Sequence, residues 1–334
     1  MTPAPQLSHR ASIMPASPIR KLVPLGDAAK QRGTHVYHLN IGQPDIETPP
    51  EFFDAVRSYQ EKVIAYGNSQ GIRLFIESLQ EYYASLSMPL AYDDIVITTG
   101  GSEAIMFAMM AVAQPGDEIL VFEPFYTNYN GFAIMAGVTL VPVGTKAEDG
   151  FHLPSAEEIA SHITPRTRAM VICNPNNPTG TVLRDDELNT VRDLALKHNL
   201  YVLSDEVYRE FAYEGAARSV LQIEGLEQHA VVMDSLSKRY SLCGGRMGAV
   251  ISRNRAFMDV MLRFGQARLC SATLEQVGSA ALVAAGAKYF DPMIAEYRQR
   301  RDATFEELQK IPGMLCRKPS GAFYIMAQFP VADI

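Results

Sequence analysis

The chain has 334 residues with a net charge of −7, and 47% of its residues are hydrophobic while 20% are charged. This composition excludes a disordered, collagen-like or disulfide-stapled chain, and the acidic balance disfavours nucleic acid, whose phosphates bind basic surfaces. Because no apolar run reaches membrane-spanning length, no signal-peptide core is found and the four cysteines show no CxxC spacing, we expect a cytoplasmic globular protein without a metal centre.

The first ninety residues predict an arm, a strand and three helices. Residues 1–20 are rich in Pro and Ser and predict an extended arm, and residues 17–32 predict a short helix with breakers. Residues 36–50 predict a short strand that runs into a loop rich in Gly and Pro. Helical spacing of apolar residues predicts helices over residues 50–63 and 71–86.

From residue 93 onward, apolar strands alternate with helices. The predicted strands lie at residues 93–101, 118–126, 139–145, 168–180, 200–208, 229–238 and 245–253. Residues 102–117 and 184–199 predict helices, and a long helix over residues 289–311 leads to a strand-like segment at 316–330. Continuous apolar strands separated by helices predict an α/β fold with a mostly parallel sheet that is covered on both faces.

Polar residues follow five of these strands, at the sheet edge where α/β proteins bind their ligands. A lysine amine at such an edge, as at Lys238, can form a Schiff base with a carbonyl, although a surface lysine in a loop is the plainer interpretation. Asp205 can pair with a buried cation such as a protonated ring nitrogen, although a helix N-cap is the plainer interpretation. Tyr208 can hydrogen-bond to a phenolate-like oxygen.

Three further segments are weaker signals when each is taken alone. Gly100 and Gly101 lie between a strand and a helix, where backbone N–H groups can bind a phosphate, but the segment lacks a Walker A lysine and a full GxGxxG pattern. Asn177 in NPNNPTG can donate an amide hydrogen bond from a rigid loop, or lie in an ordinary turn. Tyr126 can stack on a flat ring or pack in the core.

In this order and at these spacings, the segments TTGGSEAI, NPNNPTG, SDEVY and SLSKRYSLCGGRMG resemble the class I/II aminotransferases, the fold-type-I pyridoxal-phosphate enzymes. The resemblance runs from Pro18 to Phe329. It implies a three-layer αβα sandwich with a mainly parallel seven-stranded sheet, plus a smaller α/β domain. It also implies pyridoxal 5'-phosphate as cofactor, a large cofactor-binding domain over residues 45–288, and an arm and small domain over residues 1–44 and 289–334.

The resemblance also implies a role for each segment. Lys238 is expected to form the covalent link to the cofactor aldehyde and Asp205 to keep the pyridine nitrogen protonated. Tyr208, the third catalytic residue, is expected to hydrogen-bond the 3'-oxygen of the ring together with Asn177. The other expected cofactor contacts are Gly101, Ser102, Tyr126, Asn177, Ser235 and Arg246, with Tyr66 reaching the phosphate of a neighbouring subunit in a homodimer. Gly42 and Asn177 are expected to contact the substrate.

The implied activity is transfer of the amino group of an L-amino acid, with aspartate or an aromatic residue favoured, to a 2-oxo acid such as 2-oxoglutarate by a ping-pong mechanism. A C–S lyase or another pyridoxal-phosphate reaction is an alternative, because the same lysine and fold support these reactions. A non-catalytic sensing domain of a transcription regulator is a further alternative. Intact Lys238 and Asp205 disfavour it, as does the acidic sequence, which offers no DNA-binding segment.

Members of this family usually continue beyond the PSGAFY motif to an arginine that pairs with the substrate carboxylate. Because the chain ends at Ile334, we expect part of the small domain to be missing and a strand around Ala322–Ala327 to have an unpaired edge. A naturally shortened protein is the alternative. No residue here takes that arginine's role. Arg298, Arg300 and Arg301 are expected on a solvated or interdomain face of the long helix.

Overall fold

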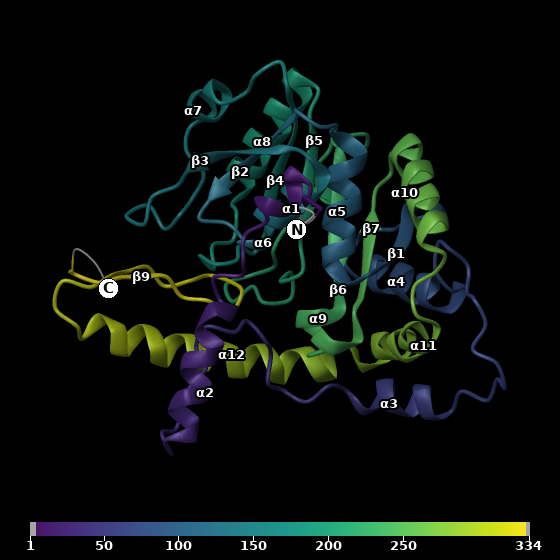
Figure 1. Ribbon diagram of the computed structural model, residues 1–334, viewed down its shortest axis with the longest axis horizontal. Coiled ribbons are helices and arrows are strands. Elements are labelled where there is room, and N and C mark those ends of the chain that lie inside the picture. Colours follow the sequence, from purple (N-terminus) through teal and green to yellow (C-terminus); the bar gives the residue numbers. More distant parts are fainter. Residues whose placement is uncertain (1–4, 332–334) are drawn as a thin grey trace.

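The structure, a computed structural model, describes residues 5–331 and is an α/β fold built on one large sheet (Figure 1). The seven strands of this sheet lie in the order β1-β7-β6-β5-β4-β2-β3. Their bounds are β1 Ile95–Thr99, β2 Glu118–Glu123, β3 Thr139–Gly144, β4 Thr167–Cys173, β5 Tyr201–Asp205, β6 Ala230–Ser235 and β7 Met247–Ile251. All neighbouring pairs are parallel except those made by β7, which is antiparallel to β1 and β6. The α/β fold with a mostly parallel sheet is therefore confirmed.

Helices cover both faces of the sheet. Alternate residues of a strand therefore enter different hydrophobic clusters, one on each face. In β2, Ile119 and Val121 pack with helices α5, α6 and α10, while Leu120 and Phe122 face the opposite cluster, which includes α4 and α8. The α-helices are α1 His9–Ser12, α2 Val23–Gln31, α3 Pro50–Arg57, α4 Arg73–Ser85, α5 Gly100–Val112, α6 Asn128–Ala136, α7 Ala156–Ser161, α8 Asp185–His198, α9 Leu236–Arg239, α10 Arg255–Arg268, α11 Thr273–Ala281 and α12 Gly286–Gln309. Among the described residues, no helix is both long and apolar enough to cross a membrane.

Two predicted strands are wrong. Residues 36–40 form no strand, and Tyr37 and Leu39 are largely exposed, so this segment has no neighbouring strand to complete a ladder. Most of 316–330 is also irregular. Strand is found there only at its two ends, where Ala327–Gln328 (β9) pairs with Leu315–Cys316 (β8), so the expected unpaired strand around Ala322–Ala327 is not found. The chain end at Ile334 lies outside the described residues.

The segment after α12 returns to the loops that follow β4 and β5, and backbone hydrogen bonds fix it to them. Gly321 N–H donates to the Gly180 carbonyl at 2.7 Å, and Ala322 N–H donates to the Phe211 carbonyl at 2.8 Å. The Tyr213 N–H donates to the Ser320 carbonyl at 2.9 Å. We call residues 319–324 the return segment. The predicted division into a domain at 45–288 and a second one at 1–44 and 289–334 stays a prediction.

Candidate functional site

A cavity of about 420 Å³ opens at the carboxyl ends of the parallel strands, where an α/β sheet usually binds its ligand. It gathers all but one of the predicted site residues: Gly42, Gly101, Ser102, Tyr126, Asn177, Asp205, Tyr208, Ser235, Lys238 and Arg246. Tyr66 does not line it, and its side chain is 81% exposed. The expected contact of Tyr66 with a second subunit stays a prediction.

The start of α5 forms one wall of the cavity and presents backbone N–H groups. An added Cβ at Gly248 of β7 would lie 2.6 Å from the carbonyl carbon of Gly100, so only a glycine lets α5 begin this close to the sheet. The Arg246 guanidinium lies against Gly100, and within residues 5–331 no carboxylate lies within 4 Å of it. A helix N-terminus beside an uncompensated cation, with Ser102 and Ser235 nearby, is suited to bind a phosphate.

Lys238 lies on the one-turn helix α9 directly after β6. The Ser235 hydroxyl accepts from the Ser237 N–H at 3.1 Å and caps this turn. The Lys238 ammonium donates to the Gly42 carbonyl at 2.6 Å, and its Nζ lies 3.8 Å from the Cys243 sulfur. The amine therefore points into the cavity, between the turn that carries it and the Gly42 loop.

Asp205 ends β5 and is buried at the floor of the cavity. Its carboxylate accepts from the Tyr129 hydroxyl at 2.8 Å and from the Val207 N–H at 3.4 Å. Burial raises the pKa of Asp205 to about 6, an effect that the Tyr129 hydrogen bond only partly offsets. Among the described residues, no Lys, Arg or His nitrogen lies within 4 Å of this carboxylate. A cation inside the cavity would remove the cost of ionising it.

Asn177, Tyr208 and Tyr324 meet at another wall. The Asn177 amide nitrogen lies 3.4 Å from the Tyr208 hydroxyl, and the hydroxyl oxygens of Tyr208 and Tyr324 are 2.6 Å apart. Burial raises the pKa of both tyrosines, so both hydroxyls are neutral near pH 7. These three side chains offer hydrogen-bond donors to an acceptor in the cavity.

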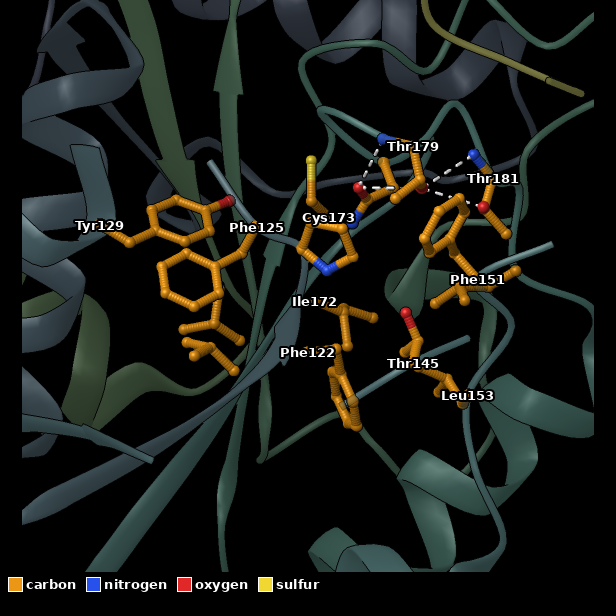
Figure 2. Close-up of a pocket in the computed structure, with 15 residues that line it drawn as sticks. Phe122, Phe125, Tyr129, Thr145, Phe151, Leu153, Ile172, Cys173, Thr179 and Thr181 are labelled. Atoms are coloured by element: carbon orange, nitrogen blue, oxygen red, sulfur yellow. Dashed lines mark hydrogen bonds between the residues drawn. The ribbon is translucent and has the colours of Figure 1, made fainter. Parts of the chain in front are cut away.

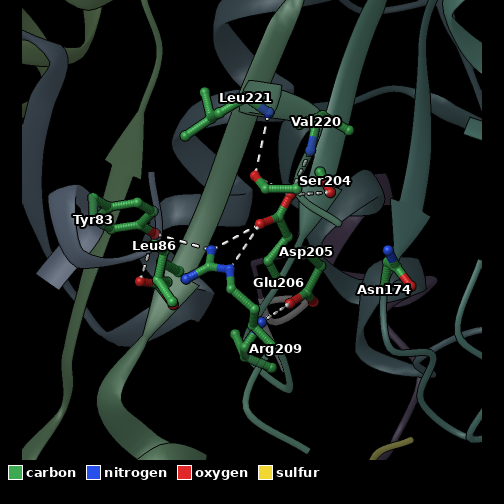
Figure 3. A network of polar contacts seen from close by, with 12 residues as sticks. Tyr83, Leu86, Asn174, Ser204, Asp205, Glu206, Arg209, Val220 and Leu221 are labelled. Atoms are coloured by element: carbon green, nitrogen blue, oxygen red, sulfur yellow. Dashed lines mark hydrogen bonds and ion pairs between the residues drawn. The ribbon is translucent and has the colours of Figure 1, made fainter. Parts of the chain in front are cut away.

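A chain of buried polar groups lies behind the site, and Figure 3 shows the part that joins Tyr83, Arg209 and Glu206. Arg209 donates to Glu206 at 2.7 Å and to the Tyr83 hydroxyl at 3.0 Å. Tyr83 donates in turn to Asp234 at 2.8 Å, and Asp234 pairs with Arg239. Glu206 adjoins Asp205 in sequence and Arg239 adjoins Lys238, so this network ties the strand of the carboxylate to the turn of the amine.

The NPNNPTG loop packs against the sheet over a small cavity (Figure 2). Thr179 donates to the Thr181 hydroxyl at 2.9 Å and lies 3.1 Å from the Asn176 side-chain oxygen. The cavity beneath it measures about 20 Å³, room for about one water molecule. This packing holds Asn177 at the edge of the larger cavity.

Three residues of the site were missed by the sequence analysis: Tyr129, Cys243 and Tyr324. Tyr129 follows Tyr126 by three residues, a helical spacing, but we predicted no helix there. Cys243 follows Lys238 by five residues, and nothing in the spacing shows that their side chains meet. Tyr324 reaches the cavity only through the fold of the return segment. Among residues 5–331, no cluster of His, Cys, Asp and Glu could hold a metal ion.

The fold and the cavity define an α/β enzyme with a lysine at the carboxyl edge of its sheet. The profile of the family described as "Aminotransferase class I and II" matches residues 34–333. The chain belongs to this family, whose members are pyridoxal-phosphate-dependent enzymes.

Individual relatives agree with this assignment. Aspartate aminotransferase of Thermotoga maritima is 32% identical over 98% of this chain and 86% of its own length. Aromatic-amino-acid aminotransferase 2 of Thermococcus litoralis is 31% identical over 96% of this chain and 82% of its own length. The structure of alanine aminotransferase from Pyrococcus furiosus superposes with a TM-score of 0.91 at 30% identity, covering 98% of this chain and 86% of that one.

Proposed function

We propose that this protein binds pyridoxal 5'-phosphate and moves the amino group of an L-amino acid to a 2-oxo acid. One observation carries the proposal: a buried carboxylate without a cationic partner, Asp205, faces the same cavity as the Lys238 amine. The ring nitrogen and the aldehyde of this cofactor need such a carboxylate and such an amine.

The residues present fit each part of the cofactor. Asp205 would hold the ring nitrogen, Tyr208 and Asn177 the ring oxygen, and Tyr126 one face of the ring. The phosphate would be held by the start of α5 with Gly101 and Ser102, by Ser235 and by the Arg246 guanidinium. Lys238 would hold the aldehyde carbon. The uncompensated charges of Asp205 and Arg246 support this orientation, because the carboxylate would face the protonated ring nitrogen and the guanidinium would face the phosphate.

Bound pyridoxal phosphate supplies an electron sink that makes the α-proton of an amino acid acidic. The chain's own residues do the rest. The carboxylate of Asp205 holds a proton at the ring nitrogen by a charge-assisted hydrogen bond. The Lys238 amine, free on one side of the cavity, takes the α-proton and returns it to a different carbon as general base and acid. The first 2-oxo acid leaves before the second binds, which is a ping-pong scheme.

We infer aspartate or an aromatic amino acid as the donor and 2-oxoglutarate as the acceptor. Support comes from the aspartate and aromatic enzymes among the relatives, although one structural neighbour is an alanine enzyme. Gly42 and Asn177 line the cavity and would contact the substrate. A C–S lyase uses the same lysine, so the two reactions are separated by their products and not by the fold.

We also propose that the active form is a homodimer. Large apolar side chains are exposed at Tyr37, Leu39, Val63, Ile64 and Tyr66. A second copy would cover these side chains and bring its Tyr66 to the phosphate.

Borohydride reduction tests the proposal directly. The protein mixed with pyridoxal phosphate should give, after reduction and digestion, one peptide in which Lys238 carries the reduced cofactor. Lys238→Ala should give no adduct and lose at least about a thousandfold in amino transfer, because it removes the general base and the covalent contact. Lys197→Ala, on the far end of α8, is the matched control. An unlabelled Lys238 would end the proposal, and release of pyruvate and ammonia from cysteine without amino transfer would favour the lyase.

A further inference from the structure

Two tyrosine hydroxyls, those of Tyr208 and Tyr324, lie 2.6 Å apart at the cavity wall. We propose that Tyr324 is a positioning residue: it donates a hydrogen bond to Tyr208 and so turns the Tyr208 proton into the cavity. This inference rests on the proposed function, because the acceptor that receives the proton is the ring oxygen of pyridoxal phosphate.

The hydrogen-bonding capacity of a hydroxyl supports this direction. A tyrosine hydroxyl has one proton to donate and can accept from other donors. The Asn177 amide nitrogen, 3.4 Å away, is a donor only, so the Tyr208 oxygen must accept from it. If Tyr324 donates as well, the accepting capacity of the Tyr208 oxygen is used on the protein side. The proton of Tyr208 is then the only group left for a ligand, and it requires an acceptor.

The return segment fixes the position of Tyr324. Hydrogen bonds join Ser320, Gly321 and Ala322 to the loops that follow β4 and β5. The Tyr213 hydroxyl also donates to the Ala322 carbonyl at 2.5 Å. Ala322 is fully buried and has a φ of 52°, a conformation that a residue with a Cβ rarely adopts. Such a conformation persists only where the surroundings enforce it, and two residues later the Tyr324 side chain lines the cavity.

The Gly42 loop closes the other side of the Tyr324 hydroxyl. A Cβ added to Gly42 would lie 2.0 Å from that oxygen, so the hydroxyl packs directly on the backbone of the loop. The Gly42 carbonyl is also the acceptor of the Lys238 amine. Tyr324 therefore lies between the expected ring-oxygen contact and the loop that touches the catalytic amine, with little freedom to turn away.

The test removes one oxygen atom. In Tyr324→Phe, the ring still fills its place but no longer donates to Tyr208, so the Tyr208 proton is less firmly directed at the ligand. The dissociation constant for pyridoxal phosphate should rise about three- to tenfold, the effect of one lost hydrogen bond. The visible absorbance of the loaded protein should also change with pH at a midpoint that is higher by about half a unit, because a ring oxygen with a weaker donor binds protons more tightly.

Two further variants distinguish positioning from a structural effect. Tyr213→Phe removes a hydrogen bond to the same return segment without touching Tyr208, and it should leave the absorbance midpoint unchanged. Tyr208→Phe should shift the midpoint further than Tyr324→Phe, and adding Tyr324→Phe to it should change nothing more, because the effect passes through Tyr208.

The outcomes separate cleanly. An equal shift in Tyr213→Phe, or a full additive shift in the double variant, would overturn the role of Tyr324 while leaving the proposed function intact. An unchanged dissociation constant and midpoint in Tyr324→Phe would do the same. If the unaltered protein fails to bind pyridoxal phosphate at all, the proposed function fails and this inference fails with it. Thermal unfolding of each variant checks that the fold is kept.

Discussion

At the scale of single residues, the ionised Asp205 carboxylate lowers the stability of the folded, cofactor-free protein. Its pKa is raised to about 6 by burial, compared with an ordinary value of 3.8. A carboxyl whose pKa is higher in the folded state contributes its full stability below pH 4, and this contribution is lost as the pH rises through 6. Above pH 7 the cofactor-free protein therefore holds a buried charge that it would be more stable without.

We therefore expect Asp205→Asn to stabilise the cofactor-free protein at pH 8 by up to about 3 kcal/mol, since one pKa unit corresponds to about 1.4 kcal/mol. Urea unfolding at pH 8 and pH 5 measures this, and the gain should shrink at the lower pH. Asp193→Asn, at an exposed position, should change neither value. A variant that is less stable at pH 8 would show that the carboxylate is already compensated by the protein. Added cofactor should stabilise the unaltered protein more than the variant.

The sequence indicates some residues of the site more readily than others. Lys238, Asp205 and Asn177 follow apolar strands directly, so the parallel sheet brings them to one edge and the strand pattern suffices to place them. Tyr324 lies 86 residues after Lys238, and no strand carries it, so only the folded return segment brings it to the cavity. Tyr129 was missed for a different reason, because its helix α6 is only nine residues long and its apolar residues do not gather on one face.

At the scale of elements, the contact between α5 and β7 sets the geometry of the expected phosphate site. Gly248 permits it, since a Cβ there would meet backbone atoms of Asp234, Gly100 and Gly101 at 2.6 to 2.9 Å. None of these atoms belongs to a flexible side chain, so the start of α5 itself must move.

Gly248→Ala should therefore weaken binding of pyridoxal phosphate at least about tenfold and destabilise the protein by about 1–3 kcal/mol, the usual cost of overpacking. Equilibrium dialysis and urea unfolding give the two quantities. Gly144→Ala is the control: this glycine also lies in a strand of the large sheet, but its added Cβ would meet no atom within 4 Å. If both variants behave alike, close approach of α5 to β7 is unimportant for the site.

The same scale shows where sequence patterns fail. Apolar runs predicted every strand of the large sheet, because buried strands need such runs. The antiparallel direction of β7 was not predicted, since direction depends on the path of the preceding turn and not on β7's own residues. The segment at 36–40 has strand-like residues, yet Leu39 is 96% exposed and has no neighbouring strand. Strand propensity is realised only where a partner edge is available.

At the scale of the whole molecule, exposed apolar side chains support the proposed homodimer. The Tyr66 and Leu39 side chains neither enter the sheet nor line the cavity. Ile64 and Val63 are likewise more than half exposed. In the proposed twofold dimer, a second copy of the chain would cover these exposed apolar side chains.

Mixing two defective variants tests this directly. We expect Lys238→Ala and Tyr66→Leu each to be impaired, the second through at least about a tenfold weaker hold on pyridoxal phosphate. If Tyr66 serves the neighbouring subunit, a mixed dimer has one site with both native residues, and random exchange should restore about a quarter of the sites to native affinity. Cofactor titration of the refolded mixture should then be biphasic, and sedimentation velocity should give a dimer throughout. A mixture with no tight sites, or a monomer that binds the cofactor tightly, would place Tyr66 outside the site and leave the exposed surface to some other partner.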